Sequence, residues 1–293
     1  MHILKGYTKQ EISWMMYDWA NSAHSVIIVT LLPIFFDTVA GYTADSVSSM
    51  STWGYATSIA MLIVALAAPF LGVFGDIRGM RKKLFRFFML LGVAACAGMA
   101  FTPGMDFTSG PVAAGKVATL ILVLYIVSVI GFDASAIYYD AFLTDVTTED
   151  RMDKVSTMGY GLGYIGGSTI PLLIFLIMNL VGVPMLTCLA FVFGLTAVWW
   201  LAFSLPLLKN CEQTSGKPYE KGDVARSIKG VGTTIKEIIA NKPMLIYILS
   251  YFFYIDGVHT VISMATTYGT NLGLDSAGML LALLLVQVLG LPF

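Results

Sequence analysis

Two short polar motifs interrupt apolar stretches of the chain and carry residue types that could handle a charged or polar solute. Each holds a carboxylate followed one turn later by two polar side chains: Asp18, Asn21 and Ser22 in the first, and Asp256, His259 and Thr260 in the second. A carboxylate at membrane depth costs at least ~2.5 kcal/mol, so it is retained where it has a partner, a wet cavity or a function. The repeated motif therefore predicts a solute or proton pathway lined by these side chains.

Two further aspartates, Asp133 and Asp140, lie seven residues apart on one apolar stretch and hence on one helical face. Asp133 is the deeper of the two, and the sequence leaves open whether it couples protons or forms a structural pair. Asp140 lies nearer the cytoplasmic end and is expected to pair with the basic residues around Arg81. His259 could relay protons, hold a solute group or hydrogen-bond across helices, whereas His24 is expected to be a satisfied core histidine.

The composition is that of a membrane protein. Hydrophobic residues make up 57% of the chain and charged residues only 12%, whereas soluble domains contain about half and about a quarter. Cys96, Cys188 and Cys211 lack the spacing of a metal or redox site. The glycine-rich stretches lack the lysine and hydroxyl pair of an ATP-binding loop. We therefore predict no enzyme activity, no catalytic residue, no metal, no cofactor and no nucleic-acid partner.

Eight apolar stretches approach the ~20 helical residues needed to cross ~30 Å of hydrocarbon. They cover residues 13–36, 53–75, 84–102, 117–143, 158–180, 184–207, 244–269 and 276–293. We expect each to be a helix, because a spanning segment must satisfy its backbone hydrogen bonds internally. The predicted fold class is an all-α, polytopic membrane protein.

The basic residues are distributed unevenly among the predicted connections. Of the 17 lysines and arginines, all but Lys116 fall before the first span, after the second and fourth, or between the sixth and seventh. These positions share one side of the membrane. Because cytoplasmic loops are rich in Lys and Arg, the N-terminus is predicted to be cytoplasmic.

The one long connection, residues 209–242, contains an amphipathic stretch. Its apolar residues alternate at spacings of four and three: Val224, Ile228, Val231, Ile235 and Ile238. This period predicts a helix with one apolar face. Such a helix could lie on the cytoplasmic membrane surface or could be a solvated linker packed on the bundle, and the sequence leaves both open.

Two features of the fifth and sixth spans concern packing. Gly159, Gly163 and Gly167 recur every four residues, a spacing that lets two helices approach closely. Trp199 and Trp200, near the end of the sixth span, are expected to anchor that helix at the membrane interface.

The connection between the second and third spans combines glycines, a carboxylate and a basic cluster. The residues that could form a conformational latch there are Gly72, Asp76, Gly79, Arg81 and Lys82, with Asp140 as the expected partner. Gly72 would permit close approach and Gly79 a tight turn. Asp76 could pair with the basic cluster or cap a neighbouring helix, and such contacts could stabilise one conformation. The spacing Gly-x-x-x-Asp-x-x-Gly-x-Arg-Lys-Lys resembles the signature loop of the major facilitator superfamily and stands where that superfamily has it.

Four further stretches narrow the resemblance. Residues 17–23, Tyr-Asp-Trp-Ala-Asn-Ser-Ala, resemble the first-helix hallmark of the autophagy-related vacuolar amino-acid effluxer branch, which also has bacterial members. Residues 138–143, 155–167 and 256–260 are similar to its fourth, fifth and seventh helices, although Asp140 stands where the branch usually has Asn. The resemblance covers essentially the whole chain, in order.

The resemblance implies twelve helices in two six-helix halves, of which this chain would hold the first eight. The expected organisation is an N-terminal six-helix half at residues 1–208, a cytoplasmic loop with an amphipathic helix at 209–242, and the first two helices of an incomplete second half at 243–293. The sequence ends within the eighth span, so we expect a C-terminally truncated product or a fragment, and a monomer when full length.

The resemblance also implies a secondary active transporter, embedded in a lipid bilayer, that alternates between inward-open and outward-open states. The expected cargo is a small polar solute, with amino-acid efflux as the leading prediction and proton coupling through Asp18, Asp133 or Asp256 as a hypothesis. The alternatives are another solute, such as a sugar, lipid or drug, and a non-transporting membrane protein. The short connections favour the plasma membrane of a bacterium.

Overall fold

The computed structural model describes residues 5–43, 46–218 and 223–289. Within these ranges the chain is mainly helical, and the only β pairing is an isolated bridge between Ile77 and Lys217. Seven helical stretches in the described ranges are long and apolar enough to cross a membrane. The predicted all-α architecture of a polytopic membrane protein is confirmed.

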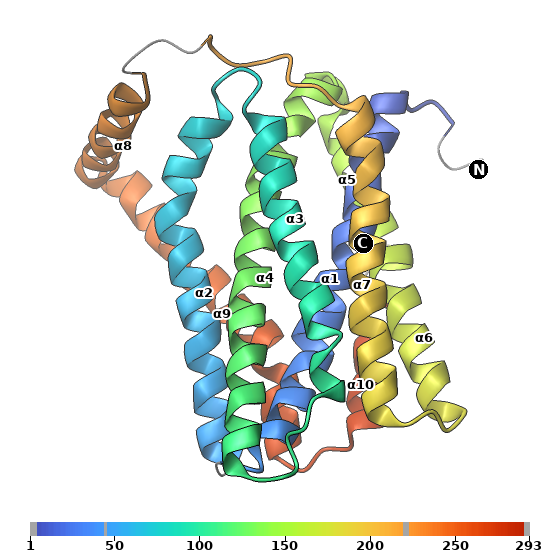
Figure 1. Cartoon of the computed structure of the whole chain (residues 1–293). Coiled ribbons are helices and arrows are strands. Elements are labelled where there is room, and N and C mark those ends of the chain that lie inside the picture. The colour runs from blue at the N-terminus through green and yellow to red at the C-terminus, as the bar shows by residue number, and fades with distance from the viewer. Residues whose placement is uncertain (1–4, 44–45, 219–222, 290–293) are drawn as a thin grey trace.

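The helices form an elongated bundle (Figure 1). In chain order they are α1 Lys9–Ala40, α2 Ser46–Gly75, α3 Arg81–Met99, α4 Pro111–Val146, α5 Met152–Leu162, α6 Thr169–Leu180, α7 Met185–Asn210, α8 Asp223–Ala240, α9 Lys242–Asn271 and α10 Ser276–Leu289. Two short 3-10 turns, η1 Thr102–Gly104 and η2 Glu149–Arg151, precede and follow α4. A π-helical turn, η3 Gly163–Ser168, joins α5 to α6 within the fifth predicted span.

The eighth predicted span is not among the seven. Its described part is α10, whose 14 residues rise about 21 Å at ~1.5 Å per residue, less than the ~30 Å of a hydrocarbon core. Residues 290–293 of that prediction lie outside the described ranges. The described part of the chain therefore contains seven candidate spans rather than eight.

α1 is the most buried of the spanning helices. Buried residues make up 78% of its most apolar stretch, against 0% for α9. A capping box starts the helix, in which Thr8 N–H donates to Glu11 Oε2 at 2.7 Å and Glu11 N–H donates to Thr8 Oγ1 at 3.1 Å. The buried Glu11 carboxylate also accepts two hydrogen bonds from the Arg151 guanidinium, both at 2.9 Å. This bidentate pair ties the start of α1 to η2.

The glycine stripe of α5 and η3 packs closely against α1, as its spacing predicts. A Cβ at Gly167 would lie 2.5 Å from the Trp19 carbonyl oxygen, and a Cβ at Gly163 would lie 2.6 Å from Ser22 Oγ. Larger residues at these positions would push η3 away from the first polar motif.

The tryptophan pair of α7 lies against α1, which corrects the predicted role as interface anchors. Trp200 is fully buried and donates from Nε1 to Tyr17 Oη at 3.3 Å. Trp199 donates from Nε1 to the Trp19 carbonyl oxygen at 2.9 Å and stacks on the Trp19 ring. Buried indole groups need such acceptors, and here they fix the position of α7 on α1.

α8 confirms the helix predicted in the long connection. Val231 and Ile238 are partly buried, while Ile235 is 50% exposed. The side chains at positions 224 and 228 lie outside the described part. The helix stands beside the start of α9, at the end of the bundle that holds the α2–α3 connection (Figure 1). Both a membrane-surface helix and a packed linker are compatible with this position.

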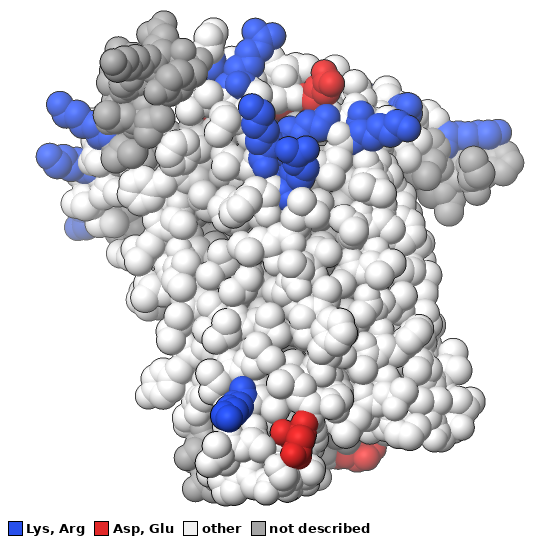
Figure 2. Space-filling model, viewed as in Figure 1, with Lys and Arg blue, Asp and Glu red and all other residues white. Residues whose placement is uncertain are grey.

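Charged side chains gather toward the two ends of the molecule and leave a wide uncharged band between them (Figure 2). On the face shown, Lys and Arg crowd the end that holds the start of α1 and the α2–α3 connection, where Arg78, Lys83 and Arg86 are exposed. Lys116, in the second turn of α4, belongs to the opposite end. The uneven distribution of Lys and Arg that the sequence predicts for the two sides of the membrane is therefore present on the folded surface.

Candidate functional site

The first polar motif borders a cavity of about 670 Å³ inside the bundle. α1 and α4 form most of its wall, with contributions from α2, α5, η3 and α9. Its polar lining consists of Asp18, Asn21, Ser22, His24, Ser25, Tyr125, Asp133, Tyr139, Asp140, Tyr160, Tyr164, Ser168, His259 and Ser263. Most of the side chains predicted for the pathway, those of Asp18, Asn21, Ser22, Asp133 and His259, therefore border one space.

Asp18 is held at the cavity by an aromatic scaffold. It is 6% exposed, and its Oδ2 accepts a 2.6 Å hydrogen bond from Tyr139 Oη. The Tyr139 ring stacks on Trp14 with ring centroids 4.4 Å apart, and Trp14 Nε1 donates to the Tyr139 carbonyl oxygen at 2.9 Å. Trp14 and Asp18 are four residues apart and share a face of α1, so one stretch of α4 fixes both.

Both aspartates of α4 line the same cavity, as their seven-residue spacing predicts. Asp133 has one carboxylate oxygen, Oδ2, that is buried without a hydrogen-bond partner among the described residues. The prediction that Asp140 pairs with the Arg81 cluster is wrong, because Asp140 lies on the cavity wall instead. Together with Asp18, the two residues give the space an acidic wall.

His24 departs from the expected satisfied core histidine. It is 2% exposed, lines the cavity, and stacks on the Phe132 ring with centroids 4.7 Å apart. Its Nε2 lies 3.2 Å from Ser128 Oγ, whereas its Nδ1 is buried without a partner in the described part of the chain. Among the described residues, therefore, only one of the two ring nitrogens of His24 has a hydrogen-bond partner.

The second polar motif contributes less than the sequence predicts. His259 lines the cavity, but Asp256 and Thr260 are exposed and do not belong to its wall. The reason is the placement of α9, whose most apolar stretch is not buried by the described part of the bundle.

The α2–α3 connection forms the predicted ion pair and adds another. Arg81 is 5% exposed, and its Nη2 lies 3.9 Å from Asp76 Oδ1. Its Nη1 donates to the Asp145 carboxylate of α4 and, at 3.1 Å, to Ser215 Oγ. Asp145, and not Asp140, is therefore the α4 partner of Arg81.

Of the two roles predicted for glycines in this connection, the tight turn lies where expected and the close approach does not. Gly79 has a φ of +80°, the turn conformation that its position predicts. Gly72 makes no close approach, since a Cβ there would meet nothing within 4 Å. The close approach occurs at Gly75, where a Cβ would lie 3.0 Å from the Tyr138 ring. Lys82 is half-buried at the start of α3.

Residues 211–217, which we call the strap, follow α7 and cross the same connection. Gln213 Oε1 accepts a hydrogen bond from Gly79 N–H at 2.8 Å. Asp145 Oδ1 accepts from the N–H and the hydroxyl of Thr214, at 3.0 Å and 2.9 Å. The strap therefore joins the α2–α3 turn to α4 at the basic end of the bundle.

His24, Tyr139 and Asp145 have roles at these sites but are not among the predicted site residues. Tyr139 directly precedes Asp140 in residues 138–143, a stretch that carries the family resemblance. Its place in that stretch could have indicated that Tyr139 belongs to the site. His24 and Asp145 acquire their roles from Ser128 and Arg81 on other helices, and no local pattern indicates such partners.

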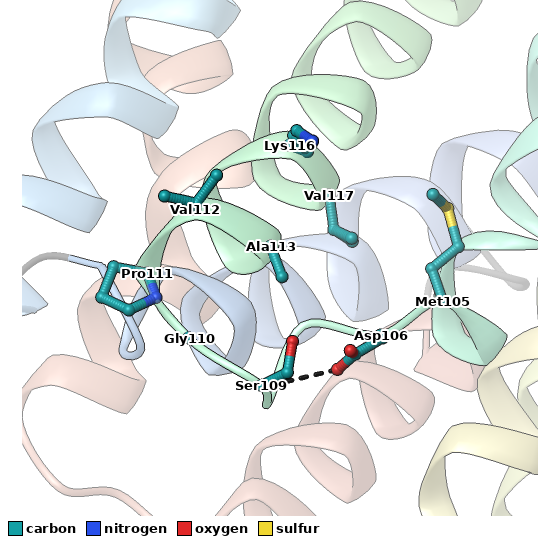
Figure 3. A pocket seen from close by; sticks show the side chains of 9 residues that line it. All are labelled: Met105, Asp106, Ser109, Gly110, Pro111, Val112, Ala113, Lys116 and Val117. Carbon is teal, nitrogen blue, oxygen red and sulfur yellow. Dashed lines mark hydrogen bonds between the residues drawn. The ribbon is translucent and has the colours of Figure 1, made fainter.

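A second hollow, of about 470 Å³, lies at the start of α4, at the end of the bundle away from the α2–α3 connection (Figure 1). Figure 3 shows its lining side chains. Residues 105–117 line it. Asp106 Oδ1 accepts hydrogen bonds there from the N–H groups of Ser109 and Thr108, both at 3.1 Å. Hydrogen bonds from Ser109 and then Thr108 hold the pKa of the Asp106 carboxyl below its usual value. Because one turn and the start of α4 form the hollow, we interpret it as loop geometry rather than a solute site.

Spanning helices around an internal acidic cavity are typical of a multi-pass membrane transporter. The fold is that of the major facilitator superfamily. The chain aligns with the crystal structure of a D-xylose-proton symporter at a TM-score of 0.61, covering 97% of this chain and 66% of that one. The two sequences are 14% identical, so this likeness concerns the fold alone.

The chain belongs to the family described as vacuole effluxer Atg22 like, whose model matches residues 42–291. It is 40% identical over 299 residues to the uncharacterized MFS-type transporter YxiO of Bacillus subtilis (strain 168), covering 99% of this chain and 67% of that relative. It is also 26% identical over 148 residues to autophagy-related protein 22-1 of Penicillium rubens, covering 47% of this chain and 25% of that protein. The chain thus spans about two thirds of the bacterial relative's length, and the family predicted from its motifs is confirmed.

Proposed function

We propose that this transporter exports a small polar solute by alternating access, with the cavity between α1 and α4 as the solute site. Amino-acid export is the leading candidate, and the family's description as an effluxer supports the direction. The observation that carries the proposal is the acidic wall formed by Asp18, Asp133 and Asp140 inside otherwise apolar spanning helices.

The cavity is suited to a small solute in size and lining. Its volume of about 670 Å³ lies within the range of roughly 300–1,000 Å³ found for small-molecule sites. Asn21 and Ser22 offer neutral hydrogen-bonding groups beside the carboxylates. Among the residues of the second motif, we assign solute contact to His259 rather than to Asp256 or Thr260.

Proton coupling is the second part of the proposal. Asp18 and Asp133 can each carry a proton, and alternating access would expose the same wall to both sides of the membrane in turn. The Arg81–Asp145 pair and the strap would stabilise one of the two states, because their bonds join three helices at one end.

The membrane setting is also a proposal. Because the basic end holds the start of α1, the positive-inside rule supports a cytoplasmic N-terminus. The B. subtilis relative supports a bacterial plasma membrane. We propose that residues 1–208 form one six-helix half, that 209–242 form the cytoplasmic connection, and that 243–293 begin the second half of a protein that is monomeric when full length.

Uptake into proteoliposomes tests the proposal. The purified protein should accumulate radiolabelled amino acids supplied as a mixture, and a pH gradient of the right sign should increase the rate. Asp18→Asn should abolish this flux, whereas Asp153→Asn, a matched change on the exposed start of α5, should leave it unchanged. Flux that is equal in the Asp18→Asn variant would contradict the proposal.

A sugar is the second candidate. The neighbouring crystal structure is of a D-xylose-proton symporter, and Asn21 and Ser22 would suit a hydroxylated solute. Labelled D-xylose belongs in the same uptake experiment. Protein-dependent flux of xylose without flux of amino acids would favour sugar transport over amino-acid export.

A further inference from the structure

Hydrogen-bond accounting fixes the proton of His24. Ser128 donates its hydroxyl hydrogen to the Tyr125 carbonyl oxygen at 2.8 Å. A hydroxyl has one hydrogen, so Ser128 Oγ can only accept from His24 Nε2, which lies 3.2 Å away. The neutral ring therefore carries its proton on Nε2, and Nδ1 presents a lone pair. This Nδ1 is buried without a partner among the described residues.

Asp133 presents a second acceptor of the same kind on the same cavity. Its Oδ2 is buried without a partner in the described part of the chain. His24 stacks on Phe132, the residue that precedes Asp133 in α4, and both His24 and Asp133 line the cavity, so the two residues border one region of its wall. Buried polar atoms are nearly always paired in native proteins, and two orphan acceptors on one cavity indicate a missing donor.

The charge of the wall defines what that donor can be. The described residues that line the cavity include three aspartates and neither lysine nor arginine. A carboxylate on the solute would therefore meet no cationic side chain among the described lining residues, whereas a cation would meet a carboxylate as counter-ion. The lining also includes the aromatic rings of Phe132, Tyr125 and Tyr160, whose faces favour a cation over an anion.

We propose that this region of the wall binds a protonated amine of the transported solute, with the Asp133 carboxylate as counter-ion and His24 Nδ1 as hydrogen-bond acceptor. An ammonium has three N–H donors and one positive charge, which matches two acceptors and an acidic wall. The inference rests on the proposed function, since it takes this cavity as the solute site. It deepens that function by naming the amine, rather than the carboxylate, as the group recognised by α1 and α4.

Three related compounds test the assignment on the wild-type chain. Phenylalanine, its decarboxylated amine phenethylamine and its deaminated acid 3-phenylpropanoate share one ring, chosen because the cavity lining is aromatic. Thermal unfolding in detergent, followed by tryptophan fluorescence at constant ionic strength, reports their binding. We expect phenylalanine and phenethylamine to raise the unfolding temperature and 3-phenylpropanoate to leave it unchanged. Equal stabilisation by the acid and the amine would overturn the inference.

Variants then assign the contact to named side chains. Asp133→Asn keeps the shape of the side chain, and His24→Phe keeps an aromatic ring on Phe132 while removing the acceptor. Each should weaken phenethylamine binding by at least about tenfold, because a charge-assisted hydrogen bond is lost. Asp153→Asn should bind as the wild type does. If Asp133→Asn and His24→Phe both fold and both bind phenethylamine with unchanged affinity, the inference is overturned.

The remaining outcomes separate the inference from the function on which it rests. Amino-acid flux without any amine binding would overturn the amine site and leave the transporter proposal standing. Amine binding without amino-acid flux would support the site and overturn amino-acid export. Stabilisation by sodium over potassium, lost in Asp133→Asn and without any amine effect, would show a metal-cation site and overturn the amine assignment.

Discussion

At the scale of single residues, the cavity depends on the hydrogen bond that holds Asp18. Tyr139→Phe removes the donor of this 2.6 Å bond and leaves a buried carboxylate oxygen without it, which typically costs about 1–3 kcal/mol. We expect a lower unfolding temperature in detergent. Tyr55→Phe, at a site that is 71% exposed, is the matched control and should change little. Equal temperatures for both variants would contradict the role given to Tyr139.

The same scale shows what a sequence can indicate about a site. Asp18, Asn21 and Asp133 are predictable because a polar side chain in an apolar span needs an explanation, whatever the rest of the fold. His24 is not predictable in this way. Its two nitrogens become unequal only because Ser128, more than a hundred residues later, satisfies one of them.

At the scale of elements, the contact of η3 with α1 positions the first polar motif. Gly167→Ala would place a Cβ 2.5 Å from the Trp19 carbonyl oxygen, and backbone cannot move aside as a side chain can. Overpacking of this kind costs about 1–3 kcal/mol, so we expect a lower unfolding temperature. Gly161→Ala meets open space on the same span and should be neutral or slightly stabilising. Equal effects of the two changes would contradict the packing described.

The strap gives a second prediction at this scale. Asp145→Ala removes the acceptor of the Thr214 N–H and of the Ser215 N–H, at 3.0 Å and 2.9 Å. Hydrogen bonds to a charged group contribute about 1.5–3 kcal/mol, so hydrogen exchange at these amides should be at least about tenfold faster. Asp140→Ala, on the same helix, should leave their exchange unchanged. If Asp140→Ala accelerates exchange as much as Asp145→Ala does, Asp145 is not the residue of α4 that holds the strap.

The elements themselves were predictable where one physical signal dominates. Hydropathy and length identify the spans, and the period of four and three identifies α8. The π-helical turn η3, the packing of Trp199 and Trp200 against α1, and the strap all depend on contacts between helices, which no local pattern encodes.

At the scale of the whole molecule, the uneven distribution of charge predicts its orientation in the membrane. An impermeant maleimide should label Thr108→Cys, on the η1–α4 connection, in intact cells. It should label Lys83→Cys, at the basic end, only after the membrane is opened. Background labelling should be low, since Cys96, Cys188 and Cys211 are buried. Burial also raises the pKa of the Cys211 thiol to about 12, which keeps it protonated and unreactive. The reverse labelling pattern would contradict the predicted orientation.

The central claim is that solute crosses the membrane through the cavity between α1 and α4. The most direct measurement is amino-acid flux in proteoliposomes after a water-soluble thiosulfonate has reacted with Asn21→Cys, on the cavity wall. Thr38→Cys, exposed on the same helix outside the cavity, is the control. We predict that modification abolishes flux for Asn21→Cys and spares it for Thr38→Cys. Undiminished flux through fully modified Asn21→Cys would contradict the claim.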